Sequence, residues 1–302
     1  SKYTLIHLPM GRNKGSSQRT KGNVKPSSSG RSAQLLGSVS TAGFLGFGES
    51  CNSLVLPTSP VHEDLDSSLP GVVRMVMNRF GKRDSTTKMK ALEDFIELCR
   101  SSEEDILKGL LPYWPRFYLK LSQDPHHRVR EMCHKAHLEL VNKIKRELAP
   151  HLKVIMPQWL LSQNDVYAPA ASAAQRSFKA AFQAAKQADA VLFCKCECLN
   201  LIQENLTTLT PDSQSDPRED EKELMSRYER VVSSSLLGLK TLLVLTCSTD
   251  GPDSYIQDRV GQIINHPKFW SHYSSPVAQV SCSWLSLISA LCQYMPKVVE
   301  CQ

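Results

Sequence analysis

The sequence predicts an all-α fold in which helix pairs stack, preceded by an extended basic arm. Three observations lead to this prediction. Similar helix starts recur about every forty residues, apolar residues recur with the spacing of one helix face, and residues 1–48 carry basic residues but no acidic one. A composition with 41% hydrophobic and 22% charged residues agrees with a folded soluble protein.

The clearest helix start lies at Asp124. Its side chain can cap a helix, and Pro125 is tolerated in the first helical turn. One apolar stripe follows at i, i+3, i+4 and i+7, formed by Val129, Met132, Cys133 and Ala136. We therefore expect a helix over residues 126–148.

Related starts lie forty residues earlier, at Asp84, and forty-one residues later, at Asp165. A period of roughly 40–47 residues is typical of HEAT and armadillo arrays. We therefore predict a HEAT/armadillo-like α-solenoid of antiparallel helix pairs over residues 69–302. Coincidence among ordinary amphipathic helices is the alternative.

Basic residues follow the first two of these starts, as they do in the second helices of HEAT repeats. They are Lys88, Lys90, Arg128 and Arg130. Two interpretations stay open for these four residues. Either they line one ridge that binds a partner, or they pair with acidic residues of neighbouring repeats.

Caps, apolar spacing and prolines divide the body into further helices. Pro112 and Pro115 should interrupt the helix that leads to Trp114. A polar segment near 207–223 and the stretch 266–270 are expected to be loops. The expected helices cover 72–80, 84–100, a helix capped by Ser102, 126–148, 150–162, 168–186, 188–206, 219–247, 255–265 and a last helix around 284–291.

The segments before the body are polar and lack helical periodicity. Residues 1–9 are expected to be an upstream remnant ahead of a start at Met10, residues 10–50 a basic, largely extended arm, and residues 51–68 a linker. The apolar residues of the arm, 35–36 and 44–47, are expected to dock on the folded body, with docking on a partner as the alternative. Because the sequence ends without a polar capping helix, we expect it to be the N-terminal piece of a longer protein.

The positive charge of the chain is concentrated in the arm. Its basic residues are Lys2, Arg12, Lys14, Arg19, Lys21, Lys25 and Arg31. Taking these seven from the 36 basic residues leaves 29 against 30 acidic residues, a net charge of −1 for the rest. Such an arm is typical of proteins that meet a polyanion, often a nucleic acid. A solubilising tail is the alternative.

The ten cysteines do not predict a metal site or disulfides. Cys194, Cys196 and Cys198 fall within one expected helix, and a helix cannot wrap three thiolates around one tetrahedral zinc. Cys133 and His137 offer only two ligands at i, i+4. Since no nucleophile elbow, phosphate-binding loop or kinase motif occurs, we expect no catalytic residue, metal or cofactor in this chain.

No secretory signal is present, and no apolar run approaches the roughly 20 residues of a membrane span. The sequence therefore predicts a cytosolic protein without membrane contact. Buried reduced cysteines are typical of that compartment.

Several strings closely resemble the N-terminal region of the listerin family, large RING-type E3 ubiquitin ligases of ribosome-associated quality control. The strings are QRTKGNVKPSSSGRSAQLL (18–36), TTKMKALEDFIELC (86–99), GLLPYWPRFYLKLSQDPHHRVRE (109–131) and APHLKVIMPQWLLSQNDVYAPAASAA (149–174). The resemblance covers about residues 10–300. It implies a long HEAT/armadillo-type solenoid whose C-terminal RING, outside this chain, holds zinc and recruits E2 and ubiquitin.

The resemblance also implies partners. Family members act on large ribosomal subunits obstructed by peptidyl-tRNA, and the N-terminal region is implied to anchor the ligase there and to meet NEMF. Ribosome contact, with ribosomal RNA and protein, is expected at Arg19, Thr20, Lys21, Asn23, Lys25 and Arg31. The ridge of Lys88, Lys90, Arg128 and Arg130 is a further expected contact for the ribosome or NEMF. The chain is expected to be a monomer.

Two rival classes stay open. One is a HEAT scaffold of the nuclear-transport or phosphatase-regulator type, which binds only protein and whose binding survives removal of the arm. The other is a HEAT-like DNA glycosylase, which needs a catalytic acid on a basic concave face. The net charge of −1 outside the arm argues against the glycosylase.

Overall fold

The computed structural model describes residues 69–214, 220–247 and 253–300. By internal contacts the chain divides into Ser1–Asn52 and Ser53–Gln302, and every described helix belongs to the second unit. The expected arm, linker and upstream remnant lie outside the described residues.

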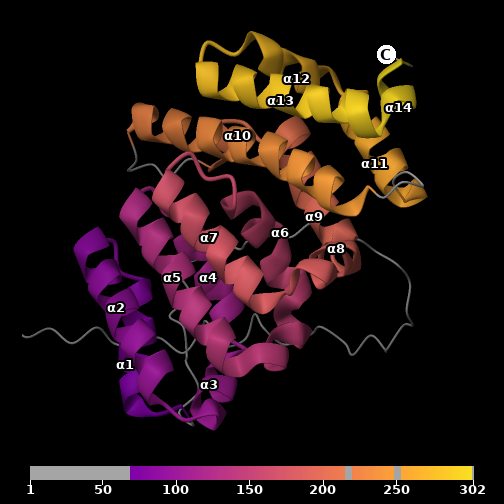
Figure 1. The fold of residues 1–302 in the computed structure, drawn as a ribbon. Coiled ribbons are helices and arrows are strands. Elements are labelled where there is room, and N and C mark those ends of the chain that lie inside the picture. The colour runs from indigo at the N-terminus through magenta and orange to yellow at the C-terminus, as the bar shows by residue number, and fades with distance from the viewer. Residues whose placement is uncertain (1–68, 215–219, 248–252, 301–302) are drawn as a thin grey trace, which may run out of the picture. The chain divides into compact units, whose positions relative to one another are not determined.

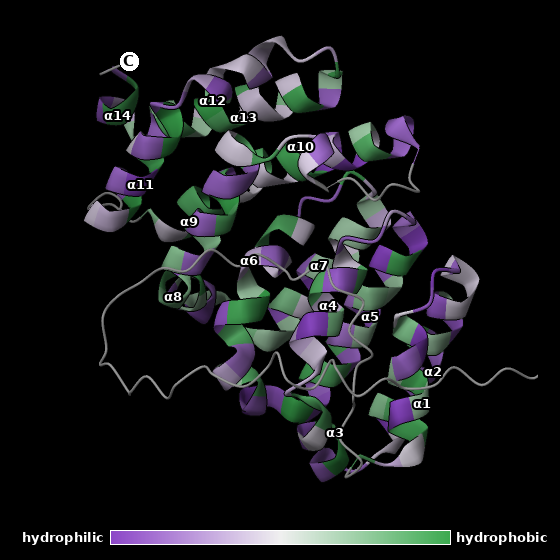
Figure 2. Ribbon diagram, turned by 180° about the vertical axis from the view of Figure 1, so that it is seen from behind, coloured by the Kyte–Doolittle hydropathy of each residue, from purple (hydrophilic) through white to green (hydrophobic). Residues whose placement is uncertain are grey.

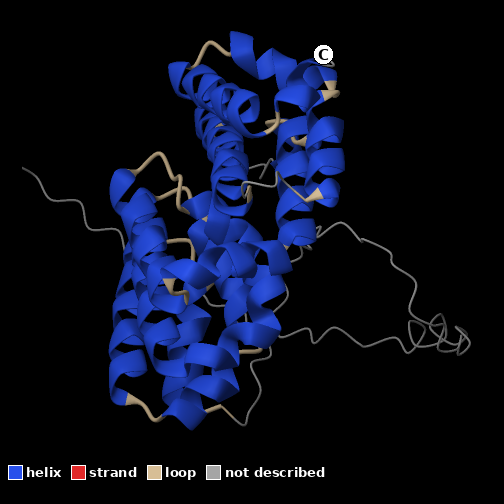
Figure 3. Cartoon of the chain, turned by 45° about the vertical axis from the view of Figure 1, so that its right-hand side comes forward, coloured by secondary structure: helices blue, strands red, loops and turns tan. Residues whose placement is uncertain are grey.

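All regular elements of the described ranges are helical (Figure 3), which confirms the all-α prediction. The α-helices are α1 (Gly71–Phe80), α2 (Ser85–Ser101), α3 (Glu104–Leu110), α4 (Trp114–Ser122), α5 (His127–Ile144), α6 (Leu152–Ser162), α7 (Ala168–Ala181), α8 (Ala184–Phe193), α9 (Lys195–Gln203), α10 (Glu221–Thr246), α11 (Ser254–Ile264), α12 (Pro267–Ser271), α13 (Ala278–Tyr294) and α14 (Pro296–Glu300). Shorter 3-10 or π turns are η2 (Lys145–His151), η3 (Glu204–Thr208), η4 (Asp212–Gln214) and η5 (His272–Ser274). None of these helices combines the length and apolar character that a membrane span requires.

Three helix pairs form the first part of the described body. Helices α1 and α2, α4 and α5, and α6 and α7 pack against each other in turn. Loops of only four or five residues join the partners, so the two helices of each pair run antiparallel. Helices α2, α5 and α7 then lie side by side (Figure 1), which brings the three loops that precede them to one edge.

Helix α10 continues the packing beyond the third pair. It packs against α6, α8 and α9 and, along its length, against α13. Its apolar face is buried and includes Leu236, Leu239, Leu242 and Leu243, whereas Val244 is exposed. Helices α11 and α12 pack near α9 and η3. Polar and apolar residues mix along each helix (Figure 2), as helices with one buried side require.

Aromatic side chains fill the core between the first pairs. The rings of Phe95 and Trp114 stack with centroids 4.7 Å apart, and Phe80 meets Phe95 edge-on at 5.7 Å. Phe80, Phe95 and Trp114 are fully buried. Burying large apolar side chains stabilises a fold by roughly 1.5–3 kcal/mol each, so this cluster holds α1, α2 and α4 together.

The prolines act as the sequence predicts. Helix α3 ends at Leu110 and α4 begins at Trp114, which confirms the interruption at Pro112 and Pro115. Pro115 lies in the first turn of α4, where its missing N–H costs nothing.

Two expected helices are each divided in two. The expected helix 168–186 ends at Ala181, because Phe182 takes an extended conformation with φ −128° and packs its ring 5.9 Å from Trp159. The expected helix 188–206 breaks at Cys194, which leaves the helical region at φ −107°, ψ 17°. Packing of the partly buried Phe182 against the core, and burial of Cys194, outweigh the local preference for a continuous helix.

Three smaller boundaries also differ. Ser102 ends α2 and does not cap α3, whose N-cap is Glu103. Helix α5 ends at Ile144, before the positive φ of 47° at Lys145, so it is shorter than expected. The stretch 266–270 is no plain loop, since Pro267 opens the short helix α12 and the His266 ring accepts a hydrogen bond from the Lys268 backbone N–H.

The close approach of α10 to α6 generates the first testable prediction. A Cβ at Gly238 would lie 3.1 Å from Leu161 Cδ1. Gly238→Leu should therefore overpack this contact and lower the free energy of unfolding by about 1–3 kcal/mol. Urea unfolding followed by circular dichroism measures the change.

The matched control for this prediction is Gly261→Ala on α11. A Cβ at Gly261 meets nothing within 4 Å, so this change should raise stability by about 0.5–1 kcal/mol. A Gly238→Leu chain at least as stable as the parent would contradict the close packing of α10 on α6.

Candidate functional site

Asp84 begins the second helix of the first pair as the sequence predicts. Its carboxylate accepts hydrogen bonds from the backbone N–H groups of Thr86, at 3.4 Å, and Thr87, at 2.7 Å. The Thr87 hydroxyl donates a further bond at 2.6 Å. These bonds, with the Thr87 side chain first, lower the pKa of Asp84. Asp84 is therefore a true N-cap.

Asp124 and Asp165 act differently from the prediction. Each accepts a hydrogen bond from the backbone N–H two residues later, at His126 (2.9 Å) and at Tyr167 (2.8 Å). Because of these Asx turns, helices α5 and α7 begin three residues after the aspartates, and their N-caps are His126 and Tyr167. The prediction that Asp124 caps the helix directly is wrong because its carboxylate is held by the turn and by a lysine of the preceding pair.

Four side chains form an ion-pair ladder across the three loops. Lys88 of α2 lies 2.5 Å from Asp124, and Arg130 of α5 lies 2.7 Å from Asp165. The Arg130 and Asp165 side chains are only 3% and 6% exposed. Each cation thus pairs with the acidic residue in the loop before the second helix of the next pair, which ties α2 to α5 and α5 to α7.

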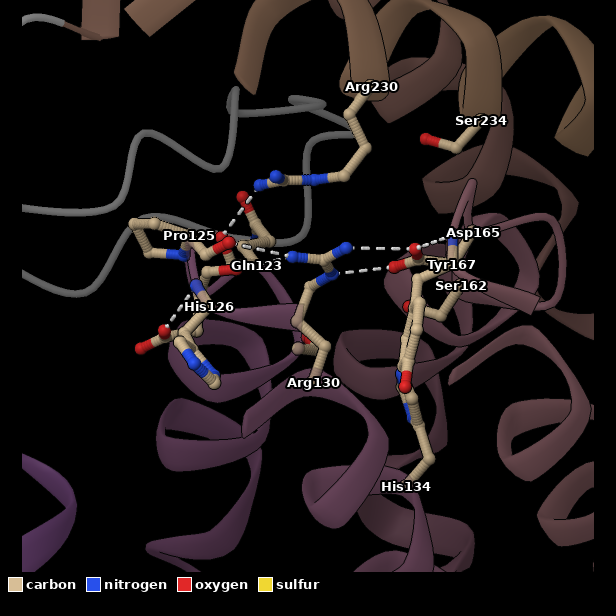
Figure 4. Close-up of polar contacts among 12 residues, drawn as sticks. Gln123, Pro125, His126, Arg130, His134, Ser162, Asp165, Tyr167, Arg230 and Ser234 are labelled. Carbon is tan, nitrogen blue, oxygen red and sulfur yellow. Dashed lines mark hydrogen bonds and ion pairs between the residues drawn. The ribbon is translucent and has the colours of Figure 1, made fainter. Parts of the chain in front are cut away.

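Arg130 uses most of its guanidinium in the ladder (Figure 4). Its Nε and Nη2 donate to the two Asp165 carboxylate oxygens at 2.7 and 3.0 Å. Its Nη1 donates to the carbonyl oxygens of Asp124 (2.9 Å) and Pro125 (3.0 Å). The side chain therefore fixes its own loop and the next one together.

The ladder divides the four expected ridge residues into two kinds. Lys88 and Arg130 pair with neighbouring helix pairs, which is the second of the two interpretations drawn from the sequence. Arg130 is buried, so its charge is not offered on a ridge. Lys90 and Arg128 are exposed, and their contact with a partner stays a prediction.

Arg230 of α10 reaches the same loops from the other side (Figure 4). Its Nη2 donates to the Gln123 carbonyl oxygen at 3.2 Å. Burial, followed by repulsion from Arg130, lowers the pKa of Arg230 to about 10. Among the described residues no carboxylate forms an ion pair with Arg230, since Asp124 and Asp165 already hold Lys88 and Arg130.

Three rings stand beside these cations, at the starts of α5 and α7. His126 and His127 stack with centroids 5.0 Å apart and an interplanar angle of 11°. Tyr167 approaches His127 at 4.3 Å. Partial loss of solvation, followed by repulsion from His126, lowers the pKa of His127, so its imidazole favours the neutral form. His127 and the next residue along the chain, Arg128, are both exposed.

Two further histidines of α5 belong to the core. Trp114 Nε1 donates to His137 Nδ1 at 3.0 Å, and the Tyr118 hydroxyl lies 3.4 Å from His134 Nδ1. Burial lowers the pKa of His134 to about 4 and that of His137 to about 3. Both histidines thus pack as neutral rings at neutral pH.

Four cysteines of the described ranges are buried in the core, namely Cys99, Cys133, Cys194 and Cys198. Cys194 and Cys198 are buried, and burial raises the pKa of Cys194 to about 12. Cys133 is buried against the Tyr118 carbonyl, and burial raises its pKa well above the usual range. No group of three or more potential metal ligands gathers in the part of the chain that the structure describes.

The arm residues expected at the ribosome lie outside the described residues, and their role stays a prediction. They are Arg19, Thr20, Lys21, Asn23, Lys25 and Arg31.

Sequence reasoning missed Arg230 altogether. Its partner Gln123 is 107 residues away, and no local pattern marks a contact at that separation.

Comparisons with known proteins agree on one family. Residues 65–302 match the family model for "E3 ubiquitin-protein ligase listerin, N-terminal domain". The listerin of Gallus gallus is 41% identical over 296 residues, which is 97% of this chain and 16% of that protein. The listerin of Mus musculus is 42% identical over 294 residues, or 96% and 16% of the two chains.

A more distant relative belongs to the same family. The listerin of Saccharomyces cerevisiae is 26% identical over 186 residues, which is 60% of this chain and 12% of that protein. The chain therefore spans about a sixth of the length of the Gallus gallus and Mus musculus listerins, 16% in each case.

The buried ion pair generates the second prediction. Arg130→Met should leave the Asp165 carboxylate buried without a partner and lower the free energy of unfolding by about 3–5 kcal/mol. Adding Asp165→Asn should recover part of that loss. Chemical denaturation measures both effects.

Arg79→Met is the control for this prediction. Arg79 pairs with Asp94 at the surface, where the side chains are 29% and 54% exposed, so its loss should cost less than about 1 kcal/mol. Equal losses from the Arg79 and Arg130 variants would contradict a special role for the buried pair.

The neutral core histidines generate the third prediction. Below pH 6.5 the unfolded chain binds protons at His134 and His137 that the folded chain does not bind. Stability should therefore fall as the pH drops from about 6.5 toward 4, by about 2 kcal/mol per histidine between pH 7 and 5. Denaturant unfolding at several pH values measures this loss.

His137→Asn should weaken the pH dependence, because its amide oxygen can accept from Trp114 but does not titrate. The loss between pH 7 and 5 should shrink by about 2 kcal/mol. His151→Asn, outside the cluster, is the control. If the free energy of unfolding falls with pH equally in the parent and the His137 variant, His137 titrates normally and the prediction is wrong.

Proposed function

Because the chain belongs to the listerin family of E3 ubiquitin-protein ligases, we propose that it is the non-catalytic N-terminal region that anchors such a ligase to its target. The target in this proposal is the obstructed large ribosomal subunit. NEMF is the protein partner. The distant C-terminal RING, with its zinc, E2 and ubiquitin, then ubiquitinates the stalled nascent chain in the cytosol.

The stack of helix pairs supports an anchoring role. Three antiparallel pairs repeat with helices α2, α5 and α7 side by side, and buried ion pairs join each repeat to the next. In this proposal the stack is a HEAT/armadillo-like solenoid. Solenoids present long surfaces to partners and act as rigid spacers, so such a region can bind at one place while a catalytic domain works at another.

The uneven charge is the observation that carries the ribosome proposal. Residues 1–48 hold seven basic residues and no acidic one, whereas the rest of the chain is nearly neutral. An extended basic segment neutralises RNA phosphates and releases counterions. Ribosomal RNA at the arm therefore explains a charge distribution that protein contact alone does not require.

Co-sedimentation with purified large ribosomal subunits across a salt series tests this proposal. Arg19→Ala/Lys21→Ala/Arg31→Ala should weaken binding by about tenfold at moderate salt and lower the salt dependence, since three phosphate contacts are lost. Lys120→Ala/Lys179→Ala/Lys297→Ala removes the same charge from exposed sites of the body and should change binding little.

Two results would contradict the proposal. Equal losses from both triple variants would mean that net charge alone drives the interaction. Binding that is unchanged by the arm variant and insensitive to salt would favour a scaffold that binds only protein.

A further inference from the structure

The loops before α5 and α7 meet the first half of α10, and this region is called the junction. Its cations outnumber the acidic side chains that pair with them. Lys88 and Arg130 are matched by Asp124 and Asp165. Arg230 enters the same junction and receives only a carbonyl oxygen, from Gln123 at 3.2 Å. One cation is therefore left without an anionic partner among the described residues.

Arg230 is placed to receive an anion from outside. The residue is only partly buried, and a guanidinium carries five N–H donors, of which the Gln123 carbonyl takes one. In Figure 4 its side chain extends from α10 toward the loop of Gln123 and Pro125. Planar guanidinium donors match the oxygens of a phosphate group. Asp165 and Asp124 also act on the charge of Arg230, but each already holds another cation.

The rings at the same loops indicate which anion fits. His127 is exposed, stacks on His126, and lies 4.3 Å from the partly exposed Tyr167. Arg128 is exposed beside them. Aromatic rings next to arginines form the platform on which unpaired nucleic-acid bases stack while their phosphates meet the cations.

We propose that this junction binds a single-stranded RNA segment, with a phosphate group on Arg230 and a neighbouring base stacked on the ring of Tyr167, which His127 and His126 support from behind. The inference rests on the proposed function, because it adds a second RNA contact to that of the arm. A duplex does not fit the proposal, since its bases are not free to stack on side chains. An acidic protein segment would use Arg230 but has no need of the rings.

The test uses the full chain with the arm variant Arg19→Ala/Lys21→Ala/Arg31→Ala as background. Fluorescence anisotropy measures its binding to a labelled single-stranded RNA of about ten nucleotides across a salt series. This background should still bind. Adding Arg230→Gln should weaken binding at least about fivefold and reduce the salt slope by about 0.7, the value for one lost phosphate contact.

Ring variants separate stacking from charge. Tyr167→Leu should weaken RNA binding about fivefold or more without changing the salt slope, and Tyr167→Phe should restore binding. Arg259→Gln on α11, whose guanidinium bonds Asn200 and Gln262, is the matched control and should bind as the background does. Circular dichroism verifies the fold, and Arg230→Lys, which keeps the charge but loses the planar donors, should bind with intermediate affinity.

Three outcomes would overturn the inference. Loss of all RNA binding in the arm background alone would leave the arm as the RNA contact and refute the junction, while the proposed function stands. Unchanged binding in both the Arg230→Gln and Tyr167→Leu chains would refute it equally. Competition by polyglutamate as strong as by unlabelled RNA, with no effect of Tyr167→Leu, would assign the junction to a protein carboxylate.

Discussion

A buried guanidinium must be neutralised, and this constraint organises the middle of the molecule. Arg130 is 2% exposed and meets both oxygens of Asp165. Removing either partner would leave a charge in a medium that solvates it poorly. Helices α5 and α7 are therefore held in one register, and the α5 loop is fixed with them through the Asp124 and Pro125 carbonyl oxygens.

The ladder also decides which charges remain for partners. Lys88 and Arg130 are used within the fold, so the surface at this edge depends on Lys90, Arg128 and Arg230. Because Asp124 and Asp165 are already paired, Arg230 enters a junction whose acids are occupied. The same bonds that stiffen the stack of helices thus leave a positive site at its edge.

The core beneath the ladder contains several polar pairs, whereas Nε2 of His134 and of His137 has no hydrogen-bond partner among the described residues. Trp159 Nε1 donates to Ser177 Oγ at 2.8 Å, and Trp114 Nε1 donates to His137. The stacked ring of His137 stays neutral because burial penalises its charged form. Such pairs fix which faces of α4 and α5, and of α6 and α7, meet, in addition to the apolar area they bury.

The sequence by itself determined the helical class, the starts near Asp84, Asp124 and Asp165, and the break at Pro112 and Pro115, because caps, prolines and apolar periodicity act within a few residues. Only the tertiary structure decided that Lys88 and Arg130 point inward, since their acids lie 36 and 35 residues away. The same holds for Arg230, whose partner is 107 residues distant. It also holds for the breaks at Phe182 and Cys194, where packing against the assembled core overrides local helix propensity.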